Sequence, residues 1–293
     1  MRAIICGDVH IGAVFGLGGP NGSGGNTDTI DKYSHSSNGN ATDTGNLTVA
    51  RQIGAGQSSS THGYTSGGHG PGNSNVIDKF TFASDANATD VGNLTVINWG
   101  PSGQKSSTHG YTAGGGRYTG AVSNVINKFS FSSDGDASDA GDLSVARSTP
   151  IGQSSRTHAY TSGGTTSDVI DKFSVSASSN ATDVGNLTQA RSFAAGQSSE
   201  THGYTSAGYI APNTNIIDKF AFASNNNATD VGDVTAARRD AGGQSYTTHG
   251  YTTGGYTTTH VNVIDKFTFA SNANATDVGD LTVARRGNAG TQY

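Results

Sequence analysis

The chain has little cysteine, little charge and no long apolar run. Cys6 is its only cysteine, which excludes an internal disulfide framework. Charged residues make up 13% of the chain and its net charge is −5, so no basic field is available to hold a nucleic-acid backbone. No segment approaches the roughly 18 consecutive apolar residues of a membrane span. We therefore expect neither a nucleic-acid partner nor a membrane span.

Turn-forming residues are abundant instead. Glycine alone fills 43 positions, and Ser, Thr, Asn and Asp fill many of the others. Such a composition can indicate disorder, but here Tyr, Phe, Ile and Val return at fixed places, which a patternless disordered chain does not show. The composition therefore favours a folded β protein.

Six copies of one unit run through the chain. The aspartate of an IDKF string recurs at intervals of 44 to 49 residues, with asparagine in the third copy: Asp31, Asp78, Asn127, Asp171, Asp218 and Asp265. An arginine lies 16 residues before a glycine pair at Arg51 to Gly67, Arg147 to Gly163 and Arg238 to Gly254, and the length varies after that pair, as a loop permits. The predicted copies are 2–50, 51–97, 98–146, 147–190, 191–237 and 238–284. With a tail at 285–293 they form one domain over residues 1–293.

Each copy contains four segments of strand character. VIDKFTF at 76–82 is rich in β-branched and aromatic residues and precedes a cluster of turn formers, SDANATD at 84–90. LTVAR, GQSSxTH and GYTSGG supply a second, third and fourth run. Four strands in about 47 residues is the size of a propeller blade. The sequence thus predicts an all-β fold, a single β-propeller of six four-stranded blades, with seven blades as the alternative and the tail as a closing strand beside the first or last blade.

The order of these signals resembles the kelch repeat of β-propellers. The resemblance covers Arg2 to Arg285: an arginine, a glycine pair with an aromatic three positions earlier, a strand ending near an aspartate, then a turn and LxxxR. The kelch tryptophan is missing, and its place falls near Val91, Val184 and Val231. The strings NATDVGDLTVAR and GQSSxTHGYTSGG are similar to repeats in predicted proteins of marine bacteriophages and large viruses.

Charge is lost at two positions together in the third copy. Asn98 replaces the arginine of the VAR string, and Asn127 replaces the aspartate of the IDKF string. A buried ion pair explains this, because loss of one partner leaves the other charge uncompensated at a cost of roughly 3–5 kcal/mol. We therefore predict structural pairs inside the other blades: Arg51 with Asp78, Arg147 with Asp171, Arg191 with Asp218, and Arg238 with Asp265.

No metal site or cofactor is expected. The histidines of the THGY strings lie in repeat register, so equivalent residues of neighbouring blades should be about 10 Å apart, too far to share a zinc ion. Asp134, Asp136 and Asp139 resemble a calcium loop, but the glycine and the bidentate glutamate of such a loop are absent, so a solvated turn is favoured. Every Ser, His and Asp candidate exists in several copies, whereas an active site needs one asymmetric place. The chain is therefore predicted not to be an enzyme.

The copies differ most in the loops after the glycine pairs. These loops carry aromatic and histidine side chains that we predict to form a binding rim, with tolerated insertions as an equal alternative: His69, Tyr118, Tyr209, Tyr256 and His260. Trp99, at the junction into the third copy, marks a second candidate patch.

Sequence and resemblance together favour a non-enzymatic structural or binding protein. The hypothesis is a phage or viral virion component, such as a tail, fibre or surface decoration, found on the virion or outside the cell. Its expected partners are other virion proteins or a cell-surface glycan, and a homo-oligomer is compatible with this role. The alternatives are a secreted carbohydrate-binding or galactose-oxidase-like kelch protein, and an intracellular kelch adaptor, which would need partner domains.

Overall fold

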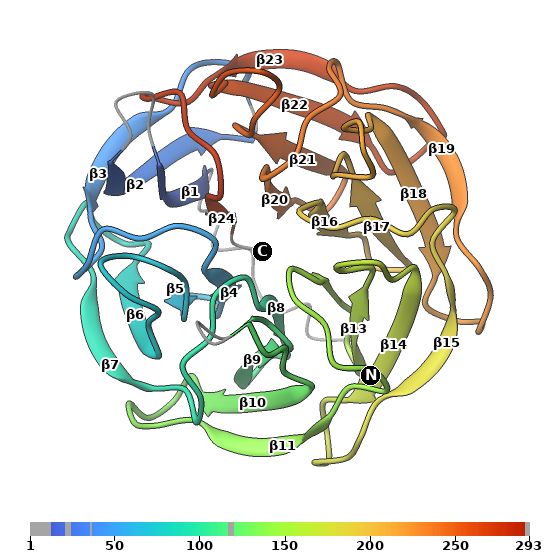
Figure 1. Ribbon diagram of the computed structural model, residues 1–293. Coiled ribbons are helices and arrows are strands. Elements are labelled where there is room, and N and C mark those ends of the chain that lie inside the picture. The colour runs from blue at the N-terminus through green and yellow to red at the C-terminus, as the bar shows by residue number, and fades with distance from the viewer. Residues whose placement is uncertain (1–12, 21–24, 36, 117–119, 291–293) are drawn as a thin grey trace, which may run out of the picture.

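The computed structural model describes residues 13–20, 25–35, 37–116 and 120–290. Six four-stranded antiparallel sheets stand around a central axis, which is the arrangement of a six-bladed β-propeller (Figure 1). The prediction of an all-β propeller with six blades is confirmed, and the alternative of seven blades is wrong. No helix long and apolar enough to cross a membrane occurs in the described ranges.

Each blade runs from an inner strand at the axis to an outer strand at the rim (Figure 1). The inner strands are β24 (Ala289–Gly290), β4 (Ala55–Ser58), β8 (Ser102–Lys105), β12 (Ile151–Ser154), β16 (Ala195–Ser198) and β20 (Gly242–Ser245). The second strands are β1 (Ala13–Pro20), β5 (His62–Ser66), β9 (His109–Ala113), β13 (His158–Ser162), β17 (His202–Ser206) and β21 (His249–Thr253). The third strands are β2 (Asn26–Ser34), β6 (Val76–Thr81), β10 (Val125–Ser130), β14 (Val169–Ser174), β18 (Ile216–Ala221) and β22 (Val263–Thr268). The outer strands are β3 (Thr42–Asn46), β7 (Thr89–Asn93), β11 (Ser138–Asp142), β15 (Thr182–Asn186), β19 (Thr229–Asp233) and β23 (Thr276–Asp280).

Both faces of a blade are buried against its neighbours. Ile77 and Asp78 follow one another in β6 and so point to opposite faces, yet both are fully buried. Tyr64 of β5 packs against Phe129 and Phe131 of the next blade, with ring centroids 5.5 and 4.9 Å apart. The apolar core therefore lies between blades, which is why one repeat cannot bury its own surface.

The outer strand corrects the sequence prediction. Its residues, such as Thr89–Asn93, begin inside the predicted turn at 84–90, whereas the LTVAR run forms no strand. Gly92 has a φ of 152° and lies where the pairing register with β6 shifts. Residue preferences for β-strands do not predict a strand with this irregular backbone. The LTVAR run instead connects one blade to the next, and at 47–51 both Leu47 and Arg51 are buried.

Six glycines, one in each inner strand, bring the blades into contact at the axis. A Cβ atom on Gly152 would overlap the carbonyl oxygen of Gly103, and the same relation runs around the whole ring: Gly56, Gly103, Gly152, Gly196, Gly243 and Gly290. The cavity that these strands enclose measures about 90 Å³. The backbone thus narrows the axis and separates its two ends, because side chains have no room at this level.

The end of the chain closes the ring. β24 is the inner strand of the first blade, where Gly290 pairs with Gly16 and Ala289 pairs with Leu17 of β1 (Figure 1). The other five blades each fall within one predicted copy, but the first blade combines residues from both ends of the described chain. Arg2, the predicted start of the first copy, lies outside the described residues.

Candidate functional site

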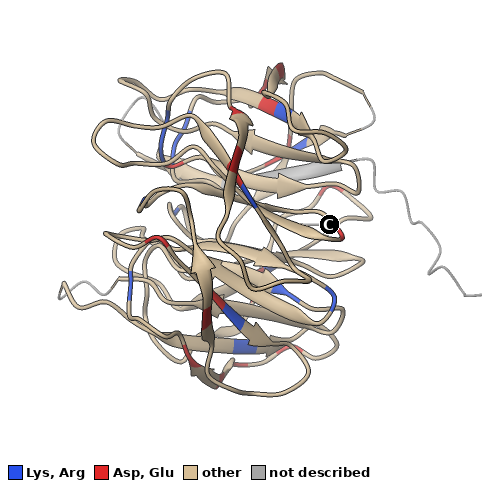
Figure 2. Cartoon of the chain, turned by 90° about the vertical axis from the view of Figure 1, so that its right-hand side faces the viewer, with Lys and Arg blue, Asp and Glu red and all other residues tan. Residues whose placement is uncertain are grey.

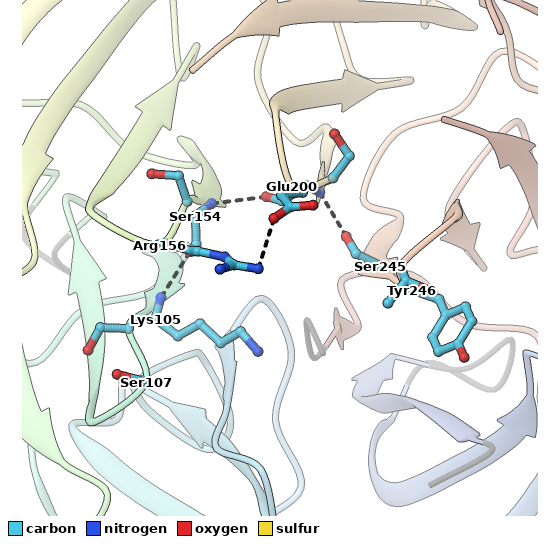
Figure 3. A pocket seen from close by; sticks show the side chains of 12 residues that line it. Lys105, Ser107, Ser154, Arg156, Glu200, Ser245 and Tyr246 are labelled. Carbon is cyan, nitrogen blue, oxygen red and sulfur yellow. Dashed lines mark hydrogen bonds and ion pairs between the residues drawn. The ribbon is translucent and has the colours of Figure 1, made fainter. Parts of the chain in front are cut away.

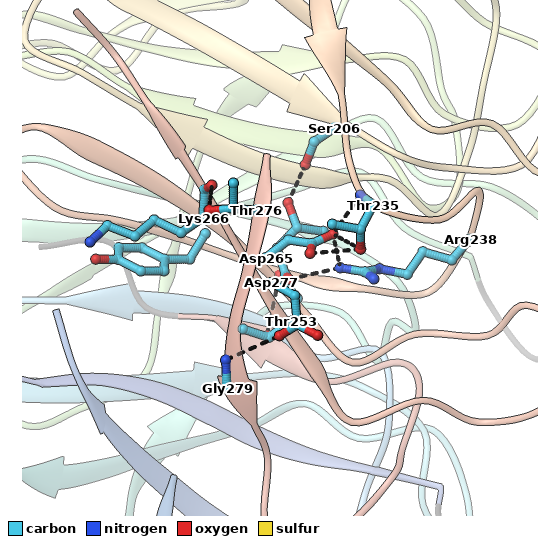
Figure 4. Close-up of polar contacts among 12 residues, drawn as sticks. Ser206, Thr235, Arg238, Thr253, Asp265, Lys266, Thr276, Asp277 and Gly279 are labelled. Carbon is cyan, nitrogen blue, oxygen red and sulfur yellow. Dashed lines mark hydrogen bonds and ion pairs between the residues drawn. The ribbon is translucent and has the colours of Figure 1, made fainter. Parts of the chain in front are cut away.

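A buried arginine–aspartate pair anchors the start of a blade. In the sixth blade, Arg238 Nη2 donates to Asp265 Oδ2 at 2.9 Å and to the carbonyl oxygen of Thr252 at 2.9 Å (Figure 4). Neither charged side chain is more than 1% exposed. The structure brings together the other predicted pairs at N–O distances of 2.9 to 3.2 Å: Arg51 with Asp78, Arg147 with Asp171, and Arg191 with Asp218. Sequence reasoning missed a fifth pair, at 2.6 Å between Arg285 of the tail and Asp31 of the first blade.

Each pair also holds the chain that arrives from the preceding blade. Asp265 accepts hydrogen bonds from the amide of Thr235 at 3.0 Å and from its hydroxyl at 2.8 Å (Figure 4). Thr235 lies in the crossover between β19 and Arg238, so one carboxylate fixes two points of this connection. Burial lowers the pKa of Arg238, and Asp265 opposes that effect. Because the pair is buried, its role is to clamp neighbouring blades rather than to contact a partner.

The third blade keeps the clamp without its charges. Asn127 Oδ1 accepts from the amide of Thr95 at 2.9 Å and from its hydroxyl at 2.6 Å. Asn98 Nδ2 donates to the carbonyl oxygen of Gly114 at 3.0 Å. Asn98 Oδ1 and Asn127 Nδ2 have no hydrogen-bond partner among the described residues. The threonine contact therefore survives, and neither position leaves a buried charge unpaired.

The histidines in register form local contacts. His62 begins β5, and its Nδ1 lies 2.8 Å from the hydroxyl of the preceding residue, Thr61. The amide of Ser59 donates to the carbonyl oxygen of His62, which closes the turn between β4 and β5. Each equivalent histidine therefore belongs to a turn of its own blade.

The three aspartates of the calcium candidate do not converge. Each carboxylate has its own partner: Asp134 accepts from Lys79 Nζ at 2.7 Å, Asp136 from the amide of Asn93 at 2.9 Å, and Asp139 from the amide of Gly141 at 2.9 Å. In the part of the chain that the structure describes, no three His, Cys, Asp or Glu side chains gather as metal ligands. The spacing that resembled a calcium loop instead serves turns and contacts between blades.

The predicted rim residues meet only in part. Tyr209 and Tyr256 form isolated β-bridges with Ser192 and Arg239, the residues that directly follow two of the buried arginines. His260 lies beside Tyr256, with ring centroids 5.6 Å apart.

One further rim candidate, His69, does not join this group. His69 Nδ1 lies 2.8 Å from Asn73 Oδ1, so His69 is held within its own loop. Tyr118 lies outside the described residues. Trp99, by contrast, bridges to Gly116 and lines the same cavity as Tyr209.

One end of the axis opens into a cavity of about 430 Å³. We name this cavity the arginine mouth and define it by residues from five blades: Gln52, Trp99, Tyr209, Arg239, Asp240 and Arg286. The second residue after each anchoring position has a φ between 50° and 61° in all six blades: Ile53, Gly100, Thr149, Phe193, Asp240 and Gly287. Three of them, Ile53, Phe193 and Asp240, line the arginine mouth. The amide of Gly100 donates to the carbonyl oxygen of Ile53, and that of Thr149 donates to Gly100, both at 2.9 Å. This backbone is strained at the branched residues and is held by bonds from blade to blade.

Two arginines and two tyrosines stack at the edge of the arginine mouth. The guanidinium of Arg239 lies 4.9 Å from the ring centroid of Tyr209 and 5.0 Å from that of Tyr256. The guanidinium of Arg286 lies 4.9 Å from the ring centroid of Tyr256. Cation–π contacts of this kind hold both guanidinium planes in place.

A carboxylate lies beneath these arginines. Asp240 Oδ2 is 3.6 Å from Arg239 Nε, and the Asp240 side chain is 8% exposed. Burial raises the pKa of Asp240 to about 6, opposed by Arg286 and Arg239. Asp240 Oδ1 and His260 Nε2 are buried without a hydrogen-bond partner among the described residues. Two arginines facing one carboxylate leave the mouth with net positive charge.

The opposite end of the axis is lined mainly by hydroxyls (Figure 3). We name it the serine mouth, a cavity of about 580 Å³ at the ends of the inner strands, defined by Lys105, Ser154, Arg156, Ser198, Glu200 and Ser245. Amides donate to serine hydroxyls from blade to blade, with the Lys105 amide 3.0 Å from Ser154 Oγ. Burial lowers the pKa of Lys105 to about 8. Arg156 and Glu200 form an exposed ion pair at 2.8 Å, so their charges balance one another.

The arginine mouth has two arginines and one carboxylate, and one oxygen of that carboxylate is buried without a hydrogen-bond partner among the described residues. On the side of the molecule drawn in Figure 2, basic and acidic residues are interspersed.

Sequence reasoning missed Arg239, Asp240 and Arg286, although a signal was present. The anchoring position is followed by a second arginine only at 238–239 and 285–286, while the other copies read RA, RQ, NW, RS and RS. No known protein family matches this chain, and no curated protein matches it in sequence.

Proposed function

We propose that this chain is a non-enzymatic binding propeller that attaches to its partner through the arginine mouth. The observation that carries this proposal is asymmetry. The scaffold repeats the same buried pairs, turns and glycine contacts around the axis, whereas Arg239, Asp240 and Arg286 occur together at one place. A pocket with converging polar groups is the usual form of a ligand site.

The proposed setting is a kelch-like component of a phage or viral virion, such as a tail, fibre or surface decoration. The wording of the repeats supports this setting, through its similarity to repeats in predicted viral proteins. A closed propeller also suits an exposed position outside the cell, because closure leaves only short, protected strand edges. Contacts with other virion proteins, with further copies of the chain or with a cell-surface receptor or glycan are consistent with it.

The rival oxidase-type function lacks a specific observation in its favour. It would need a tyrosine and histidines as copper ligands at one unique place. His62 and its equivalents lie in separate turns, and His69 pairs within its own loop. Among the described residues no three His, Cys, Asp or Glu side chains gather as metal ligands.

The virion part is tested by immunogold labelling of purified particles with an antibody against this chain. We expect gold at a defined place on intact particles. Labelling confined to free protein would overturn the virion proposal.

The binding part is tested by flow cytometry with fluorescently labelled protein on cells susceptible to those particles. We expect the Arg239→Gln, Arg286→Gln double variant to lose most of the cell-associated signal. Arg156→Gln is the matched control, because it removes one exposed arginine from the serine mouth. Equal binding by all three proteins would contradict a role for the arginine mouth.

A further inference from the structure

We propose that the arginine mouth binds a carboxylated saccharide, with the carboxylate on Arg286, a sugar hydroxyl on Asp240 and the apolar face of the sugar ring on Trp99. This inference rests on the proposed binding function and names the class of ligand. Three chemically different groups converge in one cavity, and each one fits a different part of such a ligand.

Arg286 supplies the anion contact. Arg239 is already engaged, since it is sandwiched between Tyr209 and Tyr256 and its Nε lies 3.6 Å from Asp240 Oδ2. Arg286 stacks on one face of Tyr256 and forms no ion pair with a carboxylate among the described residues. A fixed planar guanidinium at a half-buried site matches the two oxygens of a carboxylate.

Asp240 supplies an acceptor that lacks a donor. Its side chain is 8% exposed, and Oδ1 has no partner among the described residues. A buried carboxylate oxygen without a donor is costly, so a ligand that brings a hydroxyl gains by supplying one. The Asp240 position therefore suits a ligand that carries hydroxyl groups.

Trp99 supplies the apolar surface. A Cβ atom on Gly116 would lie 2.6 Å from Trp99 Cε2, so the absence of a side chain at Gly116 lets the indole lie against its backbone. The indole is therefore held in place and half-buried where it lines the mouth. Ile53 and Phe193 extend the apolar lining. A rigid aromatic surface with a few fixed polar groups is suited to a ring that has one apolar face and polar edges.

An acidic peptide is the competing ligand, because it also carries carboxylates. The donor-poor Asp240 and the flat indole favour a hydroxylated ring over a peptide. Neutral sugars are disfavoured as well, because they bring no carboxylate to the Arg286 guanidinium.

Isothermal titration calorimetry of the full chain tests the proposal with three probes. The probes are trigalacturonic acid, the neutral galactotriose, and an acetylated, amidated triglutamate peptide with the same number of carboxylates. We expect trigalacturonic acid to bind at least about tenfold more tightly than either control, the factor that one charge-assisted hydrogen bond provides.

Substitutions then assign the contacts. Arg286→Gln and Trp99→Ala should each weaken trigalacturonic acid binding by roughly tenfold or more, and Asp240→Asn by a smaller factor, because an amide oxygen still accepts a hydroxyl. Arg156→Gln at the serine mouth should leave binding unchanged. Circular dichroism melting of each variant separates a loss of contact from a loss of fold.

Four results would overturn the inference. Tighter binding of triglutamate would make the ligand a peptide, and equal binding of galactotriose would remove the carboxylate from recognition. An equal loss in Arg156→Gln would move the site to the serine mouth or to general charge. None of these results decides the cell-binding experiment, so the proposed function and the ligand class can fail separately. Absence of binding by any of the probes at millimolar concentration would also overturn the saccharide.

Discussion

The third and sixth blades differ from one another at two neighbouring positions of the repeat. The third blade has Asn98 followed by Trp99, and the sixth has Arg238 followed by Arg239. The first position of each pair is fully buried, so it must match the residue that it meets in the third strand. The second position lines the arginine mouth, where Trp99 lies against Gly116 and Arg239 stacks on two tyrosines. Burial therefore restricts which residue can occupy the first position, whereas the second position varies between blades.

The largest effect should come from breaking the match at the first position. Asp265→Asn leaves Arg238 buried without its carboxylate, and we expect the free energy of unfolding to fall by roughly 3–5 kcal/mol in urea denaturation. The double variant Arg238→Asn, Asp265→Asn copies the third blade and should recover most of that loss. If the double variant is no more stable than the single one, the pairing account is wrong.

The next effect concerns a position where all six blades agree. Gly152→Ala places a Cβ atom against the carbonyl oxygen of Gly103 in the neighbouring blade. We expect the free energy of unfolding to fall by about 1–3 kcal/mol, because the inner strands cannot move apart without loosening the ring.

Gly72→Ala is the control for this substitution. A Cβ atom there would meet nothing within 4 Å. Thermal melting should therefore separate the two alanine variants clearly, and similar melting temperatures would contradict the crowding at the axis.

A third effect comes from Asp240 and depends on pH. Burial raises the pKa of Asp240 to about 6, so the folded protein holds this proton more tightly than the unfolded chain. The stability that this proton contributes is fully present below about pH 4 and is lost as the pH rises through about 6. Arg239, Arg286 and His260 are the charged or titratable groups around it.

Asp240→Asn should therefore stabilise the protein at neutral pH. Each pKa unit corresponds to about 1.4 kcal/mol, and we expect a gain of roughly 1–2 kcal/mol above pH 7 because water at the mouth screens part of the charge. Below about pH 4 the variant and the parent should unfold alike. A pH-independent difference in urea midpoints would show that the carboxyl is not the cause. A stabilised variant that binds less well would indicate that the strained mouth serves binding.

The smallest effect should come from the exposed ion pairs at the rim. Lys79 Nζ and Asp134 Oδ1 are 2.7 Å apart, but their side chains are 22% and 56% exposed. Asp134→Asn should change the free energy of unfolding by no more than about 0.5 kcal/mol. Millimolar calcium should leave the melting temperature of the parent unchanged, because a bound ion would raise it by mass action.

The repeat made most of the scaffold predictable. Paired losses at Asn98 and Asn127 pointed to the arginine–aspartate clamp, because a buried charge needs a partner wherever it lies in the sequence. The outer strand was not predictable in the same way. Its residues look like a turn, and LTVAR looks like a strand, but packing against the next blade reverses the two assignments.

The sequence indicated only some residues of the candidate site. The tyrosines of the variable loops attracted notice as aromatics, and the doubled arginines at 238–239 and 285–286 were present as a signal. The contacts between these tyrosines and arginines could not be predicted from the sequence, because Tyr256 stacks with Arg239 of its own blade and with Arg286 of the tail. That contact exists only after the ring has closed.

The sequence by itself determined the number of copies, the β character and the buried pairs, since repetition records every constraint that each blade shares. Only the tertiary structure decided which residues of different blades meet at each end of the axis. Ring closure places β24 in the first blade, and with it Arg286 next to Tyr256 and Asp240. The physical reason is that a repeat specifies contacts between neighbours, whereas a site at the axis is built from residues of several blades at once.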